Sequence, residues 1–590
     1  MDPVPFWKVN KVELRAVIGT FSVRAIFGMV ALCVASIIGF LFTIHAVNSL
    51  FLVEAPAYGG SMREGIIGSP RFVNPVLSVS ESDEDLARLI YTGLMRKNGD
   101  GTILPDLAER YNVSENGLEY TFTLRDSAVF HDGTPVTSED VSYTVLMTQD
   151  QAVKSPRKIN WEGVKIEAIS EKTIRFTLKQ PYPPFLEENA RLGILPKHLW
   201  KDLSAEEFAL SDYNIEPIGA GPYRLERVLK THGIPSEYNL VSFENYARGR
   251  PFIDHVTLFV YPNERELLTA FDRGEITNIS AITPDRASEF HDSSAVEIKT
   301  APLPRVFAIF LNQNEAQIFL SKKLRQAIDK VIDKKKIVSE VLHGFGTPLE
   351  GPIPPSNPFY EKQDMERLSE EEILALFAGE GWKKNEVTGL LTKEERRGKT
   401  LASSTLSFSI TTGDIPELTK AANLVRDMLS RVGISAEVKI FSESDLRQNA
   451  IKPRKYDALL YGNQVEHDSE LYAYWHSSER LSPGLNFAVY TNTKVDRALE
   501  EMRISYDPDK RKESYMLLER EIREDAPAIF LYSPNFIYIV KSGIEGIGLG
   551  GLQKPADRFA NIYEWYIEKQ YVWPIFKDIP IIKKIEEVIN

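Results

Sequence analysis

Two alternating segments predict β-strands in the first third of the chain. Tyr120 to Arg125 and Thr173 to Leu178 alternate apolar and polar side chains, which is the period of a half-buried strand. Between them, His131-Asp132-Gly133-Thr134-Pro135 forms a turn cluster in which Gly133 supplies an unusual φ. Thr137 stands three residues before Asp140, a spacing that predicts the capped start of a helix.

Residues 404–461 follow a different pattern. Apolar residues alternate, then fall at helical spacing, then alternate again, and a short helical stretch precedes a final apolar run: Leu406 to Ile410, Leu418 to Val432, Ile434 to Ile440, Ser444 to Ile451, and Tyr456 to Tyr461. Gly433 is a suitable helix stop. This order of strand, helix, strand, helix and strand predicts an α/β lobe with parallel strand pairing.

The length of the chain calls for more than one hydrophobic core. A chain of 590 residues is expected to form two or three domains, and its 43% apolar and 26% charged residues are ordinary for a globular protein. A β-rich region and an α/β lobe leave a cleft between them, where small ligands usually bind.

One uncharged apolar segment near the N-terminus predicts a membrane anchor. Ala25 to Val47 contains 23 residues without Lys, Arg, Asp or Glu, enough for a helix of about 35 Å across a hydrocarbon layer of about 30 Å. Lys8, Lys11, Arg15 and Arg24 precede the segment, and Glu54 is the first charge after it. The positive-inside rule therefore predicts a cytoplasmic N-terminus and an extracytoplasmic bulk, periplasmic or at the cell surface.

The same segment is too long for a typical signal-peptide core of about 7–15 residues, which favours a retained single-pass anchor in the plasma membrane. A lipoprotein signal would need a small residue before Cys33, but Leu32 stands there. Cys33 is the only cysteine, so the exported part can form no internal disulfide.

Composition and motifs argue against several classes of function. A net charge of −13 argues against a nucleic-acid partner. The nine histidines include no HExxH motif, and neither a GxSxG elbow nor a Walker A sequence occurs. We therefore predict no catalytic residue, no metal site and no cofactor, and expect that the protein is not an enzyme.

Two short matches to catalytic or nucleotide-binding motifs have ordinary structural explanations. Ser155-Pro-Arg-Lys158 fits SxxK, but the proline is a poor start for a catalytic helix, which favours a solvated loop. Gly546-Ile-Gly548-Leu-Gly-Gly551 fits GxGxxG, yet Pro555 and a polar loop follow where a dinucleotide site needs a helix. A glycine turn is the favoured interpretation.

An ordered set of motifs resembles the bacterial extracellular solute-binding proteins of the oligopeptide, dipeptide and nickel class. The stretches are Met62-Arg-Glu-Gly65, Phe72-Val-Asn74-Pro75, Leu89 to Leu94, Gly101 to Leu107, Phe130 to Thr144, Gly219 to Tyr223, Phe243 to Tyr246 with Gly249 and Pro251, Leu324 to Asp329 with Ile337 and Gly344, and Gly351 to Pro355. They follow the family order from about residue 60 to 565.

The resemblance implies an α/β, periplasmic-binding-protein-like two-lobed fold of type II with an extra domain, preceded by one transmembrane helix. It would divide the chain into a cytoplasmic N-terminus at 1–24, the anchor at 25–47, and a base lobe from 58–97, 218–305 and 535–570. An extra domain would occupy 98–217, the second ligand-binding lobe 306–534, and a C-terminal extension 571–590.

The function implied by the resemblance is capture of short peptides and delivery to the permease subunits of an ABC importer, by a monomer. Alternatives are a binder of another small solute (a nickel complex, a muropeptide or an oligosaccharide) or a surface sensor not coupled to transport. An exported hydrolase is a further alternative, although no nucleophile or metal constellation supports it.

The resemblance also implies the ligand site. In peptide-binding relatives, an acidic residue after the strand that matches Tyr456 to Gly462 pairs with the peptide ammonium. Glu466 and Asp468 are the candidates here, and their alternation with His467 suggests that one of them faces the ligand. The other expected ligand-binding residues are Gly462, Asn463, Gln464, Val465, Gly65 and Asn74. A surface acidic loop is the alternative.

Two departures from the family pattern leave the ligand class open. The acidic stretch lacks the proline that commonly follows it, and Ile276-Thr277 stands where an Ile-Asp pair is usual.

Overall fold

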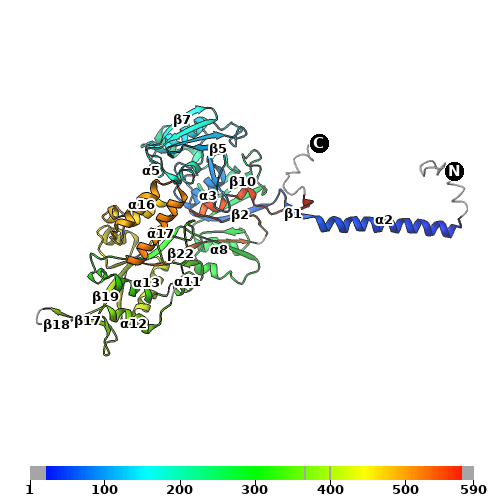
Figure 1. The fold of residues 1–590 in the computed structure, drawn as a ribbon. Helices are drawn as coiled ribbons and strands as arrows, with labels where there is room; N and C mark the ends of the chain where they lie inside the picture. The colour runs from blue at the N-terminus through cyan, green and yellow to red at the C-terminus, as the bar shows by residue number, and fades with distance from the viewer. Residues whose placement is uncertain (1–20, 364–366, 398–399, 542, 575–590) are drawn as a thin grey trace, which may run out of the picture. The chain divides into compact units, whose positions relative to one another are not determined.

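The structure is a computed structural model that describes residues 21–363, 367–397, 400–541 and 543–574. It forms two compact units, Met1–Ala57 with Glu568–Asn590, and Tyr58–Ile567 (Figure 1). Most of the predicted cytoplasmic N-terminus, 1–24, and of the predicted C-terminal extension, 571–590, lies outside the described residues.

The first unit contains the predicted anchor segment. Helix α2 (Val23–Phe51) begins after Ser22, whose hydroxyl accepts a hydrogen bond from the Ala25 N–H. Val23–Asn48 is long and apolar enough to cross a membrane, the one such helix in the described part of the chain. Strand β1 (Val53–Pro56) pairs antiparallel with β23 (Lys569–Val572), and both strands belong to this unit.

The second unit, Tyr58–Ile567, contains two sheets that share one long strand. The first sheet is built around β2 (Ser61–Ile67), which lies parallel to β11 (His255–Tyr261) and to β12 (Asn278–Ile279). Its other strands pair antiparallel: β9 (Tyr223–Thr231), β10 (Ile234–Ser242), β13 (Val296–Pro302) and the second half of β22 (Ala528–Lys541).

The second sheet has the parallel core that the sequence predicts. Strand β19 (Ser407–Gly413) lies between β20 (Ser435–Phe441) and β21 (Ala458–Gln464), parallel to both. Helix α13 (Pro416–Arg431) connects β19 to β20 and ends before Gly433, which has a φ of 92°. Strands β14 (Arg305–Leu311), β15 (Gly346–Pro348) and the first half of β22 complete the sheet in antiparallel directions.

The chain passes between the two sheets at two adjacent points. Strand β13 of the first sheet continues into β14 of the second through Leu303 and Pro304, and β22 crosses back at Ser533 and Pro534. The two connections touch, because the Leu303 N–H donates to the Pro534 carbonyl at 3.1 Å. These crossings fall where the predicted base and second lobes meet, and the lobe boundaries themselves stay a prediction.

Residues 98–217 form a small antiparallel sheet with its own apolar core. Its strands are β5 (Ala108–Val113), β6 (Glu119–Leu124), β8 (Thr173–Thr177) and β7 (Lys165–Ser170), in that order. Gly133 has the expected positive φ, 86°. The Thr137 N–H donates to Asp140 Oδ2 at 2.9 Å at the start of α4 (Ser138–Gln149), which confirms the predicted cap.

The remaining helices and strands of the second unit complete its cores and its surface. The helices are α3 (Glu81–Ile90), α5 (Lys158–Trp161), α6 (Lys197–Trp200), α7 (Ala205–Leu210), α8 (Glu264–Asp272), α9 (Pro284–Ser288), α10 (Lys322–Val331), α11 (Lys334–Val341), α12 (Glu370–Gly379), α14 (Glu443–Asp445) with a π-helical turn (Leu446–Ile451), α15 (Asp468–Trp475), α16 (Thr493–Ile504) and α17 (Pro508–Asp525). Short strands are β3 (Met95–Lys97), β4 (Ile103–Pro105), β16 (Lys383–Lys384), β17 (Leu391–Arg397) and β18 (Thr400–Thr405).

Candidate functional site

A cavity of about 800 Å³ lies where three parts of the second unit meet. One wall comes from α3 and the segment 553–557, another from residues 157–193, and a third from residues 466–470 with Arg503. Tyr91, Trp161, Tyr182 and Phe185 give the lining an aromatic part, and the rest mixes charged with uncharged side chains. The volume and the mixed lining are typical of a small-ligand site.

Glu466 faces this cavity from the loop that follows β21. Its side chain is 16% exposed, and it accepts a hydrogen bond from the Gln464 amide. His467 Nε2 lies 4.0 Å from Glu466 Oε2. Burial raises the pKa of Glu466, against the opposing effect of Lys554. A carboxylate in this environment is stabilised when a cation is placed against it.

Asp468, the alternative acidic residue, is occupied by protein partners. It is 3% exposed at the first position of α15, where an acidic side chain suits the helix dipole. Arg511 Nη2 donates to its Oδ2 at 2.8 Å, and the Tyr515 hydroxyl donates to its Oδ1. Arg511 and Tyr515 are four residues apart on one face of α17. The geometry therefore assigns Asp468 to the packing of α15 on α17.

The other predicted residues near Glu466, of which 462–464 end β21 and Val465 follows it, do not line the large cavity. Gly462 lies against Phe307, whose ring would be 2.6 Å from an added Cβ. Asn463 is buried, and its Oδ1 has no hydrogen-bond partner in the part of the chain that the structure describes; Gln464 contacts Glu466. Val465 is buried and lines a neighbouring cavity of about 110 Å³ together with Asp468.

Gly65 and Asn74, predicted as ligand-binding residues, have packing roles in the structure. An added Cβ at Gly65 would meet Leu267 at 2.4 Å and Ile276 at 2.5 Å, so this position is needed for close packing on β2. Asn74 is fully buried; its amide donates to Asn214 Oδ1 at 3.1 Å and its Oδ1 accepts from the Val76 N–H at 2.9 Å. Neither residue is among those that line the two cavities.

His467 joins carboxylates from two regions of the chain. Its Nε2 lies 2.9 Å from Oε1 of Glu188, and its backbone N–H donates to Oε2 of Glu470 at 2.6 Å. Burial opposes a charged imidazole, but Glu188 together with Glu470 and Glu187 outweighs it and raises the pKa of His467. Burial also raises the pKa of Glu470. With Glu466, three carboxylates lie around one histidine.

An adjoining wall of the cavity is built by ion pairs between distant segments, and its Gln553 Nε2 lies 3.4 Å from His467 Nε2. Gln553, Lys554 and Asp557 follow the glycine turn, and they contact α3 and residues 187–191. Arg88 and Arg191 both reach Asp557 Oδ1, at 2.9 and 2.5 Å. Although burial opposes its charge, these two cations hold the pKa of Asp557 well below its usual range. The segment is thereby fixed as a charged wall of the cavity.

Sequence reasoning missed this wall and the residues 157–193. A partial signal existed in α3, where Glu84 and Arg88 are one helical turn apart and therefore share a face. Residues 553–557 gave no signal, since their partners lie hundreds of positions away, as Arg88 and Asp557 show with a separation of 469.

The structure also shows the environment of the two short motif matches, SxxK and GxGxxG. Ser155 is 6% exposed and donates to the Val76 carbonyl at 2.6 Å, so the predicted solvated loop is wrong at this residue because the hydroxyl is buried. The residues after Gly551 form a loop and then a 3₁₀ helix (Pro555–Phe559), in agreement with a glycine turn. The described residues contain no group of three or more His, Cys, Asp or Glu side chains that could hold a metal ion.

Comparison with known proteins defines the class. The family of bacterial extracellular solute-binding proteins, family 5 (Middle), matches residues 102–481, which is more than half of the chain. The chain belongs to this family. The predicted family, the α/β periplasmic-binding-protein fold and the single N-terminal apolar helix are thereby confirmed.

Relatives within the family are named for the peptides that they bind. The oligopeptide-binding protein AppA of Bacillus subtilis is 27% identical over 87% of this chain and 93% of its own length. The probable D,D-dipeptide-binding periplasmic protein DdpA of Escherichia coli is 26% identical over 82% of this chain and 90% of its own.

Solved structures share the same fold. AppA of B. subtilis in complex with a nonapeptide aligns with a TM-score of 0.61 and 25% identity over 87% of this chain and 100% of its own. NikZ from Campylobacter jejuni in complex with Ni(L-His) aligns with a TM-score of 0.65 and 23% identity over 86% of this chain and 99% of its own.

Proposed function

We propose that this protein captures short peptides outside the cytoplasm and delivers them to the membrane permease of an ABC importer, without catalysing a reaction. The segment 25–47 would hold it in the plasma membrane with the N-terminus in the cytoplasm. Membership of the family and the names of the relatives support the transport role.

One observation carries the peptide assignment. Glu466 is a largely buried carboxylate on the wall of an 800 Å³ cavity, while its neighbour Asp468 is held by Arg511 and Tyr515. A carboxylate in a water-poor cleft forms a strong charge-assisted hydrogen bond with an ammonium group. Glu466 is therefore the residue that we assign to the peptide N-terminus.

Lobe movement supplies the means of capture and release. The two adjacent connections at Leu303–Pro304 and Ser533–Pro534 are the type of short hinge about which two lobes close. Closing removes Glu466 and the ligand ammonium from water, which strengthens their interaction. Opening at the permease would rehydrate both groups and release the peptide.

The test is a titration of the full-length protein in detergent with a peptide identified by mass spectrometry of co-purified ligand. Glu466→Gln should lose about 30-fold to several thousand-fold in affinity, because it leaves the ammonium buried without its partner. N-acetylation of the peptide should weaken binding to the wild type far more than to this variant.

Glu443→Gln provides the matched control, since the Glu443 side chain is 78% exposed outside both cavities. It should bind like the wild type. A few-fold effect of Glu466→Gln, no larger than that of the control, would show that the assignment is wrong.

A further inference from the structure

The first unit places two exposed aromatic side chains at the end of its apolar helix. Phe51 is the last residue of α2, and its ring stacks on that of Trp573, with the ring centroids 5.8 Å apart and the planes 9° from parallel. Phe51 is still 54% exposed and Trp573 is 40% exposed, while Tyr571, two residues earlier, is 66% exposed. Exposed aromatic rings beside the end of an apolar span are a candidate contact surface.

Two paired strands hold Trp573 beside the helix end. In the ribbon of β1 and β23, Val53 lies opposite Val572, so the strand that follows α2 and the strand that precedes Trp573 are neighbours. The pairing reaches the boundary of the first unit, because the Ala57 N–H donates to the Glu568 carbonyl at 2.9 Å. The chain therefore leaves and re-enters this unit through a double-stranded connection.

The first charge after the apolar segment is paired within this ribbon. Lys569 Nζ lies 2.6 Å from Glu54 Oε1, and the two side chains are 36% and 41% exposed. A lone carboxylate at this position would be repelled by the phosphate groups of a lipid surface, and an adjacent cation reduces that repulsion. The ribbon is therefore compatible with close approach to lipid headgroups.

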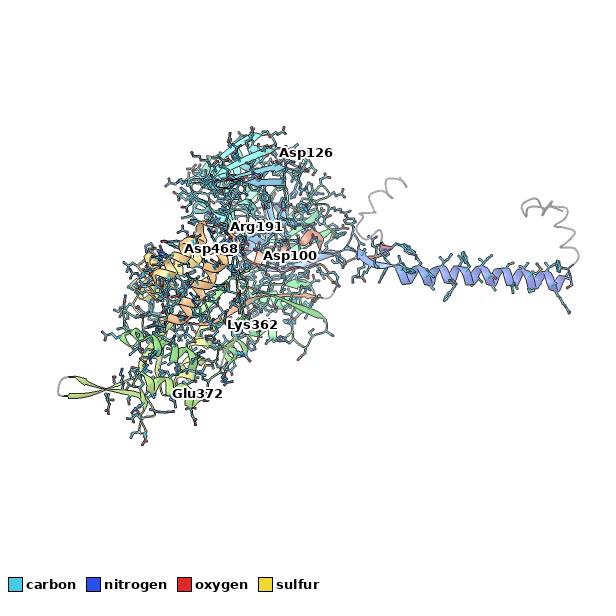
Figure 2. All side chains as sticks on the ribbon, in the orientation of Figure 1. Asp100, Asp126, Arg191, Lys362, Glu372 and Asp468 are labelled. Carbon is cyan, nitrogen blue, oxygen red and sulfur yellow. The ribbon has the colours of Figure 1, made fainter. Side chains whose placement is uncertain are left out.

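The position of the stacked pair along the helix matches the depth of a headgroup layer. Figure 2 shows side chains projecting from α2 on all sides, as expected for a helix that is surrounded by lipid. With Val47 at the edge of the hydrocarbon layer, Phe51 lies about 6 Å farther along the helix axis. The headgroup layer extends about 5–8 Å from that edge on each side of the bilayer. The ring of Phe51, and that of Trp573 stacked on it, therefore fall inside this layer.

We propose that Phe51 and Trp573 form an interfacial anchor that binds the headgroup layer of the extracytoplasmic leaflet, as a second membrane contact beside the α2 span. The inference rests on the proposed insertion of residues 25–47 and adds that the C-terminal strand is tied to the same membrane surface. Tryptophan suits this role because its ring is apolar while its indole N–H donates to headgroup oxygens.

The contact restricts the movement of the binding unit. Residues 52–57 separate Phe51 from the start of the second unit at Tyr58, and residues 568–572 return beside them. One strand is continuous with the membrane helix and the other is held by Trp573, so the connection is fixed at both strands, unlike a single flexible linker. The captured ligand stays close to the membrane, where a permease accepts it.

Quenching of tryptophan fluorescence tests the anchor on the full-length protein in phosphatidylcholine vesicles. The contribution of Trp573 is the difference between the wild type and Trp573→Phe, in which the signals of the other tryptophans cancel. We expect lipids brominated near the headgroup end of their acyl chains to quench this contribution more strongly than lipids brominated near the bilayer centre. Acrylamide, a water-soluble quencher, should reduce it less than it reduces the fluorescence of free tryptophan.

Trp382→Phe is the matched control. Trp382 is 6% exposed and packs in the apolar core beneath the second sheet. Its difference signal should be unaffected by either brominated lipid. Both variants keep an aromatic ring at the substituted position, so their folds should be retained, which circular dichroism checks.

The outcomes separate this inference from the proposed insertion. If the protein does not float with the vesicles after an alkaline wash, the insertion of α2 fails, and the interfacial anchor fails with it. If the protein floats but brominated lipids leave the Trp573 signal unchanged, the anchor is overturned while the insertion stands; acrylamide then shows whether water or another part of the protein surrounds the ring. Stronger quenching from the bilayer centre also overturns the anchor, because Trp573 would then lie in the hydrocarbon layer.

Discussion

Two stretches that resemble family signatures each hold a buried histidine, and the pKa values of the two imidazoles are shifted in opposite directions. In the turn at 130–135, His131 Nε2 donates to the Gly221 carbonyl at 3.1 Å, and its Nδ1 accepts from the Gly219 N–H at 3.3 Å. Burial lowers the pKa of His131 to about 4, so the ring is neutral at pH 7. Between β21 and α15, His467 lies beside Glu188, which raises its pKa.

The difference separates a structural motif from a binding site. Both ring nitrogens of His131 have backbone partners, so the turn is complete without a ligand. Around His467 lie the carboxylates of Glu188, Glu466 and Glu470, and Lys554 also acts on Glu466. Burial raises the pKa of Glu466 and Glu470, and a cationic ligand in the cavity would stabilise their charged forms.

The largest expected effect concerns the acidic pair in the loop. Asp468→Asn should reduce the free energy of unfolding by about 3 kcal/mol, because it leaves the Arg511 guanidinium, whose side chain is only 22% exposed, without its carboxylate. Glu466→Gln, two residues away, should reduce it by under about 1 kcal/mol while lowering peptide affinity. Denaturant unfolding of both full-length variants in detergent measures the contrast. Equal stability of the two variants would remove the distinction between a packing and a binding carboxylate.

The two histidines should give pH dependences of opposite sign. In the folded protein His131 has a pKa of about 4, whereas in the unfolded chain it takes up a proton below about pH 6.5. The free energy of unfolding therefore falls as the pH drops from about 6.5 to about 4, by about 3 kcal/mol in total. His131→Gln should flatten this part of the profile. His467 has a raised folded pKa, so its contribution is present below the unfolded pKa and is lost as the pH rises through the folded pKa.

Unfolding measured from pH 4 to pH 8 for wild type, His131→Gln and His467→Gln tests the comparison. Difference profiles of the same sign for the two variants would contradict it.

The smallest expected effect is at a contact between the second-sheet region and residues 98–217. The Tyr506 hydroxyl lies 2.5 Å from the Tyr120 hydroxyl, accepts from the Tyr182 N–H at 3.0 Å and donates to the Gly117 carbonyl at 3.2 Å. Tyr506→Phe removes these bonds and should weaken the closed state, with up to about a tenfold loss of peptide affinity. Tyr472→Phe is the control, since that hydroxyl is 3.5 Å from its one partner, Ser478, and exposed. Equal affinities for the two variants would exclude Tyr506 from closure.

Elements encoded by local patterns could be predicted from the sequence. The alternation around β19 and β20, the helical spacing of α13 and the stop at Gly433 gave these elements and their parallel pairing. The Thr137–Asp140 cap was equally local. In each case the signal and the structure lie within a few residues, so periodicity and capping chemistry are sufficient.

The candidate site could be predicted only in part. The loop after β21 was identified through its resemblance to a family pattern, but the sequence left Glu466 and Asp468 as alternatives. The choice between them depends on Arg511 and Tyr515, more than forty residues downstream on α17. Gly65 and Asn74 lie in a matching motif, yet their side-chain environments are packing contacts.

By itself, the sequence determined the apolar N-terminal segment, the mixture of a β-rich region with an α/β lobe, and the family. These follow from hydrophobic periodicity and from the order of short motifs along the chain. Only the tertiary structure decided which charges share the cavity, because Glu84, Glu188, Glu466 and Asp557 belong to four separate segments. Their protonation and their capacity to bind a ligand depend on burial and on neighbours a few ångströms away, which linear order does not specify.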